Sequence, residues 1–270
     1  MNSAGPRVTG TVENRVARRR SRRRFACALT VAALSVAAQA LAVDGVIEIN
    51  QARADKGGIT PGDAPGLPIT ISTGTFSTEP MTFRLTGPLV NSTTSDVIQI
   101  LSPHVTVDLN GFMITCALGS CSGNGILSGE DDVTVINGSV RGFSEGIDLA
   151  GSGCRVENLR ALGNGVGVRL GNDGSVRDCS TNGNSNDGIR VGAGCTVSGN
   201  TASANGGDGI CTHERCTLIG NTATGNGGYG FDLSTDAGYS RNVISGNTTG
   251  TVLNGVSAGL NVCNGVATCP

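Results

Sequence analysis

Apolar and polar residues alternate in short stretches that recur every 21 residues along the chain. Each stretch begins after a glycine, and these glycines are Gly125, Gly146, Gly167, Gly188, Gly209 and Gly230. The apolar residues that follow them are Ile126, Ile147, Val168, Ile189, Ile210 and Phe231. A fixed period of this length is typical of a solenoid, in which every repeat stacks on the repeat before it.

The pattern inside each repeat predicts three short strands. Polar and apolar positions alternate after the glycine, a second short apolar stretch follows, and a third leads to the next repeat. Strands this short, separated by Gly, Asn and Ser turns, suit a coil in which each strand pairs in parallel with its counterpart about 4.8 Å away in the next coil. We therefore predict an all-β parallel solenoid of roughly seven or eight coils.

An asparagine lies twelve residues after most of the repeated glycines. These residues are Asn137, Asn158, Asn200, Asn221 and Asn242, and Cys179 takes the place in the remaining repeat. We expect the side-chain amides to stack in a hydrogen-bonded ladder that satisfies backbone groups at a turn.

The sequence outside the repeat predicts a signal segment and two caps. Residues 1–42 contain two groups of three arginines, then an apolar run with Ala-x-Ala motifs, as in a cleaved export signal. Residues 43–94 lack the period and are expected to cap the first coil, with a short helix near Gln51–Lys56. The β-helix is assigned to residues 95–256 and a cysteine-bearing C-terminal cap to 257–270.

Composition and charge narrow the class of protein. The chain has 43 Gly, no Trp and 3% aromatic residues, too few large side chains for an ordinary layered domain. Removal of residues 1–42 takes away 8 of the 19 Lys and Arg but one of the 21 acids, which leaves a net charge of −9. A nucleic-acid partner is therefore not expected. No later segment is apolar enough to span a membrane, so we expect an exported protein, periplasmic or extracellular, with the Sec or twin-arginine route left open.

Two segments carry a family resemblance. Asp187–Ala202 reads D-G-I-x-V followed by V-S-G-N-x-A, and Val105–Phe112 reads V-T-V-D-L-N-G-F. They resemble the right-handed parallel β-helix repeat shared by pectate lyases, polygalacturonases and many exported bacterial proteins. Ile49–Ile71 is similar to the N-terminal region of a subgroup without assigned activity. The resemblance covers about residues 45–262 and implies a right-handed parallel β-helix.

The enzyme motifs of that family are mostly missing. Polygalacturonase-like sites combine three Asp with Gly-His-Gly and Arg-x-Lys, and this chain has neither of the last two motifs. We therefore expect a non-catalytic, polysaccharide-contacting or structural module of the cell envelope or exterior. The alternative is a polysaccharide lyase or glycoside hydrolase with a divergent active site, so enzymatic activity stays open.

Two outward columns of the predicted coils carry candidate chemistry. The position two after each repeated glycine gives Leu127 and then the polar residues Asp148, Arg169, Arg190, Cys211 and Asp232. The arginines suit the carboxylates of an acidic sugar polymer, and Asp148 suits an acid or base. The alternative is a solvated face with an Asp148–Arg169 pair.

The position before each repeated glycine places Asp187 and Asp208 one coil apart. Two carboxylates that close share a proton or bind a cation, for which Ca²⁺ is the expected guest. The alternative is that both side chains extend into water. The spacing of Cys211, His213 and Cys216 also fits a copper or zinc site, with a disulfide loop as the alternative.

Ten cysteines in an exported chain favour disulfides. One of them lies in the signal segment, so nine remain and at least one lacks a partner within the chain. The short-loop candidates are Cys116–Cys121 and Cys263–Cys269. Cys195 and Cys216 occupy the same position in adjacent repeats and form a third candidate pair, with which Cys211–Cys216 competes. Cys154 and Cys179 are expected near the interior.

Overall fold

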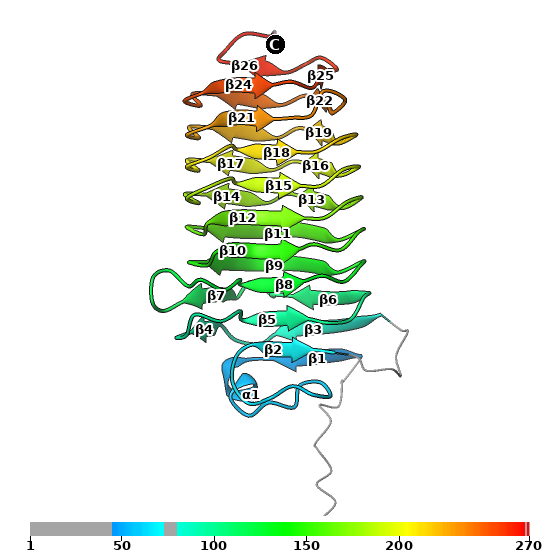
Figure 1. The fold of residues 1–270 in the computed structure, drawn as a ribbon, viewed down its shortest axis with the longest axis vertical. Helices are drawn as coiled ribbons and strands as arrows, with labels where there is room; N and C mark the ends of the chain where they lie inside the picture. Colours follow the sequence, from blue (N-terminus) through cyan, green and yellow to red (C-terminus); the bar gives the residue numbers. More distant parts are fainter. Residues whose placement is uncertain (1–44, 73–79, 268, 270) are drawn as a thin grey trace, which may run out of the picture. The chain divides into compact units, whose positions relative to one another are not determined.

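A computed structural model describes residues 45–72, 80–267 and 269. The signal segment predicted for residues 1–42 lies outside these ranges. The described chain winds into stacked coils that carry three short strands each, and every named strand pairs in parallel with its counterparts in neighbouring coils (Figure 1). The only helix described is too short to cross a membrane.

The first strands of the coils form one sheet, which has nine strands within the described residues. Its members are β2 (Ile69–Ile71), β5 (Ile98–Ile100), β8 (Ile126–Ser128), β10 (Glu145–Leu149), β12 (Val166–Leu170), β15 (Ile189–Val191), β18 (Ile210–Thr212), β21 (Tyr229–Asp232) and β24 (Gly250–Leu253). The solenoid therefore has about nine turns, more than the seven or eight expected.

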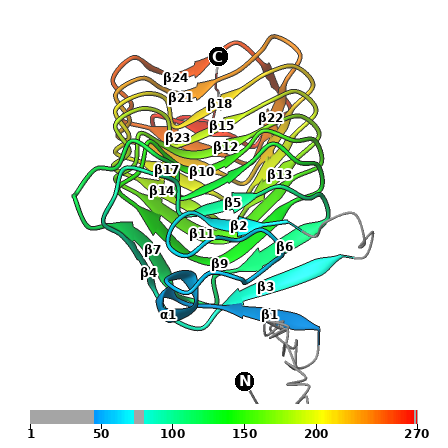
Figure 2. The same cartoon turned by 60° about the horizontal axis from the view of Figure 1, so that its bottom comes forward.

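The second and third strands of the coils form the opposite side, in a sheet of 17 described strands (Figure 2). The second-strand column contains β1 (Val46–Ile49), β3 (Met81–Leu85), β6 (Val105–Asp108), β13 (Ser175–Arg177), β16 (Thr196–Ser198), β19 (Thr217–Ile219), β22 (Gly238–Ser240) and β25 (Val256–Ser257). The third-strand column contains β4 (Leu89–Asn91), β7 (Met113–Cys116), β14 (Ser180–Asn182), β17 (Thr201–Ser203), β20 (Thr222–Thr224), β23 (Val243–Ser245) and β26 (Val262–Cys263). The longer β9 (Thr134–Arg141) and β11 (Arg155–Leu162) run through both columns and join them.

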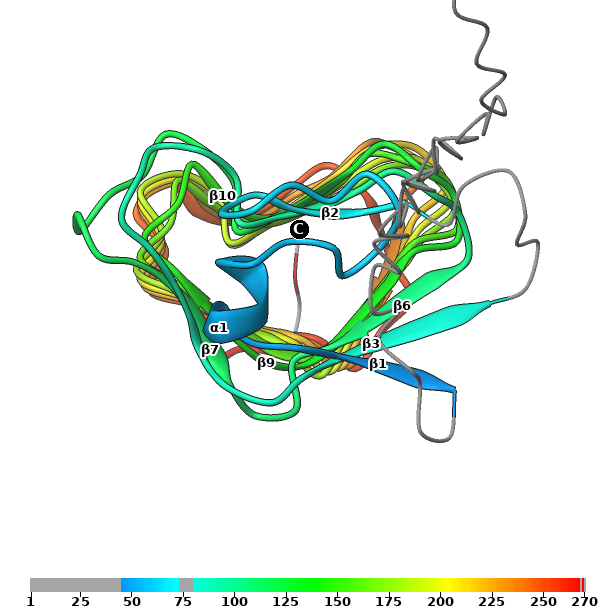
Figure 3. The same ribbon diagram turned by 90° about the horizontal axis from the view of Figure 1, so that it is seen from below.

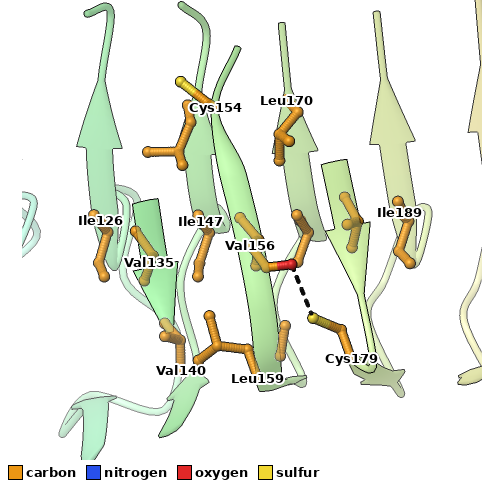
Figure 4. Packing of buried hydrophobic residues seen from close by; sticks show 14 of the residues in the cluster. Ile126, Val135, Val140, Ile147, Cys154, Val156, Leu159, Leu170, Cys179 and Ile189 are labelled. Carbon is orange, nitrogen blue, oxygen red and sulfur yellow. Dashed lines mark hydrogen bonds between the residues drawn. The ribbon is translucent and has the colours of Figure 1, made fainter. Parts of the chain in front are cut away.

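The register confirms the predicted stacking of like residues. Ile126, Ile147, Val168, Ile189, Ile210 and Phe231 are consecutive partners in the first sheet, and all are fully buried. Figure 4 shows Ile126, Ile147 and Ile189 facing Val135 and Val156 across the interior. The core is thus a set of apolar columns between the two sheets, and this burial is the main term that holds the coils together.

The coils begin earlier in the sequence than expected. Strands β2, β3 and β4 lie within residues 43–94, yet they pair in register with β5, β6 and β7. The lack of a fixed period there reflects connections of varying length. A short helix, α1 (Gln51–Ala54), lies at this end of the solenoid, as Figure 3 shows from below, and Asn50 caps it by accepting the backbone N–H of Arg53.

The asparagine ladder differs in part from the prediction. Asn200, Asn221 and Asn242 do stack, and Asn261 extends the ladder. Asn137 and Asn158 lie one position earlier, outside the core, because β11 pairs with β13 at a separation of 20 residues rather than 21. The short coil is followed by one extra residue, Asn186, before the next repeated glycine. The repeated glycines therefore stay 21 residues apart, and their spacing does not reveal the shift.

A second amide ladder, which was not predicted, lies at the next turn. Its members are Asn164, Asn184, Asn205, Asn226 and Asn247. Nδ2 of each of the first four donates both to Oδ1 of the next amide and to a backbone carbonyl of the preceding coil. The two ladders satisfy turn backbone that is otherwise buried without partners.

Within the described residues, two disulfides are present, Cys116–Cys121 and Cys263–Cys269. The free thiols there are those of Cys154, Cys179, Cys195, Cys211 and Cys216. Neither candidate pair involving Cys216 is bonded. Cys195 and Cys216 point into the core, where their thiols donate to the carbonyls of Gly171 and Gly192. Cys211 lies on the outer face and so cannot reach Cys216.

Candidate functional site

The outer face of the first sheet carries the polar column predicted from the sequence. Asp148, Arg169, Arg190, Cys211 and Asp232 are consecutive partners on β10, β12, β15, β18 and β21. We call these five residues the central column. Because the strands are parallel and in register, side chains 21 residues apart in sequence stand one coil apart in space.

Asp148 and Arg169 form an ion pair at the start of the central column. Nη1 of Arg169 lies 3.2 Å from Oδ2 of Asp148, and the side-chain exposures are 47% and 9%. Burial raises the pKa of Asp148 against the opposing effect of Arg169, and the nearby carboxylate of Glu145 raises it further. Oδ1 of Asp148 is buried and has no hydrogen-bond partner among the described residues. The site therefore holds a poorly solvated carboxyl group beside a half-exposed guanidinium.

Arg190 pairs with a different acid. Its Nε and Nη2 both donate to Oδ2 of Asp187, at 3.0 and 2.6 Å. Asp187 is 7% exposed, and its hydrogen bond raises the pKa of Arg190. Arg169 is thus held by a carboxylate of the preceding coil, and Arg190 by a carboxylate of its own coil. Together with His213 they line a depression of about 340 Å³ whose remaining wall includes backbone at Gly171 and Gly192.

The acids before the repeated glycines have a structural role. Oδ1 of Asp187 accepts the backbone N–H of Asp208 at 2.9 Å, and Oδ1 of Asp208 accepts that of Tyr229 at 2.6 Å. Asp96 and Asn124 do the same for the next coils. Burial raises the pKa of Asp208, and the adjacent Asp187 adds to this. These side chains therefore fasten one coil to the next, a role that their spacing alone did not show.

Asp187, Asp208 and Cys211 do come together, with one potential ligand atom of each within 4.8 Å of the others. The set fits Ca²⁺ poorly, because Ca²⁺ takes six to eight oxygen ligands, one donor here is a thiol, and Arg190 already occupies Asp187. Burial raises the pKa of the Cys211 thiol to about 12. Asp232 lies beyond Cys211 in the column, and burial raises its pKa as well.

The copper or zinc site expected from Cys211, His213 and Cys216 is not formed. Cys211 lies on the outer face, His213 is exposed, and Cys216 is 1% exposed inside the core. Cys216 lies between β18 and β19 and points into the core, on the other side of the coil wall from Cys211, so the two sulfur atoms cannot converge on a single ion.

The comparisons with known proteins place the fold in a family. Residues 104–249 match the family model described as "Right handed beta helix region". The chain belongs to the right-handed β-helix family. No curated protein matches it in sequence.

Solved structures share this fold at low identity. The A-module of the Azotobacter vinelandii mannuronan C-5 epimerase AlgE4 is 15% identical, with a TM-score of 0.52 over 76% of this chain and 68% of the module. The Dettilon tailspike protein is 17% identical, with a TM-score of 0.50 over 63% of this chain. This chain spans 40% of that tailspike. A pectate lyase, Pel9A, is 14% identical with a TM-score of 0.43, and the match covers 83% of this chain and 81% of the Pel9A chain.

Proposed function

We propose that this β-helix is an exported, non-catalytic module that contacts an acidic polysaccharide through the central column. The observation that carries the proposal is the pair Arg169 and Arg190, which stand one coil apart, are each 47% exposed and share one depression. The two disulfides of the described chain support an oxidising, extracytoplasmic location.

The geometry suits a chain of carboxylated sugars. Guanidinium groups bind carboxylates through paired N–H donors, and two of them repeat here at the coil spacing of about 4.8 Å. Each arginine is oriented by an acid that is itself almost fully buried, so the arginine side chain has less conformational freedom to lose on binding. A protein of the same fold carries mannuronan, an acidic polysaccharide, in its name.

A second candidate function rests on Asp148. Its buried carboxyl group has a raised pKa and an unpartnered oxygen, which are properties of an acid or base in polysaccharide cleavage. In that case, the same face would be the active site of a polysaccharide lyase or glycoside hydrolase. Release of unsaturated sugars or reducing ends that is lost in Asp148→Asn would establish this function and overturn the non-catalytic proposal.

The binding proposal is tested by titrating the protein with hexamannuronate in a calorimeter or by NMR. We expect saturable binding that weakens by about 10- to 100-fold in Arg169→Gln or Arg190→Gln, since a hydrogen bond to a charged group contributes about 1.5–3 kcal/mol. Arg177→Gln is the matched control, because Arg177 is an exposed arginine in the same coil as Arg169 but on the opposite sheet. Absence of binding, or an equal loss in the control, would contradict the proposal.

A further inference from the structure

A second polar depression lies on the other side of the solenoid, at the corner between the second- and third-strand columns. Its volume is about 460 Å³, and we call it the corner depression. The polar side chains that line it are Asn110, Asn137, Asn158, Arg160, Asp178 and Ser180. None of them belongs to the central column.

Four consecutive coils keep a polar side chain at this corner although the backbone there favours glycine. Asn110, Asn137, Asn158 and Asp178 have φ angles of 50°, 61°, 51° and 54°. In the next two coils the same corner is Gly199 and Gly220, and a Cβ at Gly220 would meet nothing within 4 Å. Glycine is the least strained residue at positive φ. Amide and carboxylate side chains occupy this corner only in the coils that line the corner depression, and Arg241, at a φ of 60°, occupies it in the coil after Gly220.

The amides of the corner depression are fixed in orientation. Nδ2 of Asn158 donates to Oδ1 of Asn137 at 3.0 Å, and Nδ2 of Asn137 donates to Oδ1 of Asp108 at 3.1 Å. The other oxygen of Asp108 accepts Nε of Arg84 at 3.2 Å. This chain of hydrogen bonds ends at the exposed Asn158, whose Oδ1 accepts from no group that the structure describes. An incoming hydroxyl group would find an acceptor already in place.

The floor and the charges of the corner depression define the ligand class. Gly111 and Gly138 contribute backbone to the lining, and Leu159 lies beside them. Arg160 and Asp178 contribute opposite charges, so the lining favours neither an anion nor a cation. Side-chain amides that recur once per coil, together with the hydroxyl of Ser180, match the hydroxyl groups of a neutral, extended sugar chain.

We propose that the corner depression binds a neutral β-1,4-linked oligosaccharide lying along the solenoid axis. The amides repeat at the coil spacing of about 4.8 Å, close to the repeat of successive sugars in such an extended chain. No aromatic side chain lines the site to stack on a sugar ring, so affinity is on the order of millimolar. The site is independent of the arginines proposed to bind acidic sugars.

The test is a saturation-transfer NMR titration of the full chain with cellohexaose. Asn137→Gly combined with Asn158→Gly removes both amides and keeps the positive φ, which glycine adopts freely. We expect binding by the parent protein and a loss of about tenfold or more in the double variant, since each hydrogen bond contributes about 1 kcal/mol.

Asn254→Gly is the matched control, because Asn254 is exposed at a φ of 60° outside the corner depression. The control and Arg169→Gln are expected to bind cellohexaose as the parent does, which separates this site from the central column. No saturable binding by the parent, unchanged binding in the double variant, or equal binding of the curved chain maltohexaose would overturn the proposal.

Discussion

The buried amide ladder at Asn205 offers a direct test of how the coils are held together. Asn205 is 2% exposed, and its Oδ1 accepts both the backbone N–H and Nδ2 of Asn184, at 3.1 and 2.9 Å. Its Nδ2 donates to Oδ1 of Asn226 and to the carbonyl of Thr181, at 2.9 and 3.2 Å. Asn205→Ala removes all four hydrogen bonds at a site that water does not reach.

The expected loss of stability follows from the groups left without partners. A buried donor or acceptor that loses its partner costs about 1–3 kcal/mol. Asn205→Ala takes the acceptor from the backbone N–H of Asn184 and a donor from the carbonyl of Thr181. We therefore expect the free energy of unfolding to fall by about 3–5 kcal/mol. Urea titration followed by circular dichroism measures the change through the unfolding midpoint and slope.

Asn182→Ala is the matched control from the adjacent coil. Asn182 is exposed and makes a single side-chain hydrogen bond, to Oγ of Ser203 at 2.8 Å. Its replacement is expected to change the free energy of unfolding by less than about 0.5 kcal/mol. If Asn205→Ala proves no more destabilising than Asn182→Ala, the amide ladder does not support the stack and the reasoning is refuted.

Three further predictions concern packing, charge and thiol reactivity. Gly188→Ala would place a Cβ 2.5 Å from Oγ1 of Thr181 and 2.7 Å from the carbonyl oxygen of Gly209, so it should clearly lower the melting temperature. Gly129→Ala, whose Cβ would meet nothing within 4 Å, should not lower it, and equal melting curves would contradict this prediction. Because the pKa of Asp148 is raised, the folded protein binds the carboxyl proton of Asp148 more tightly than the unfolded chain does. The stability of the parent relative to Asp148→Asn should therefore fall as pH rises from 3.8, the ordinary pKa of this carboxyl group, through its higher pKa in the folded protein. Urea midpoints across that range check the sign, and a relative gain in stability would refute it. Burial raises the pKa of the Cys211 thiol to about 12, so Cys211 should react with iodoacetamide far more slowly at neutral pH than an unfolded-state thiol. Rapid labelling seen by mass spectrometry would show that burial and the nearby carboxylates do not suppress the thiolate.

The glycine period predicted the apolar columns because like residues must lie over like residues in a parallel coil. The partners of Ile147, Val168 and Ile189 could be named from spacing alone, and so could the order of the central column. The ion pairs within it could not. Whether Arg190 turns to Asp187 or to a neighbour in the column depends on side-chain conformation, which sequence spacing does not specify.

Two parts of the fold could not be predicted because coil length varies. A coil of 20 residues moved Asn158 from the interior ladder to the outer corner, while a compensating insertion kept the glycines in step. At the N-terminal end, β2 and β5 pair at a separation of 29 residues, so no period marks them as coils. The amide ladder through Asn205 does leave a signal in the sequence, because an asparagine recurs every 21 residues from Asn184 to Asn247.

Stacking of residues 21 apart is the claim on which every site here depends, and engineered disulfides test it most directly. Asn182 and Ser203 are cross-coil partners on outward-facing positions of β14 and β17, and the coil spacing of about 4.8 Å lies within disulfide range, whereas Thr224 lies one coil further. We expect Asn182→Cys with Ser203→Cys to form a disulfide that mass spectrometry maps, and Asn182→Cys with Thr224→Cys to form none. Equal cross-linking of the two pairs, or of neither, would contradict it.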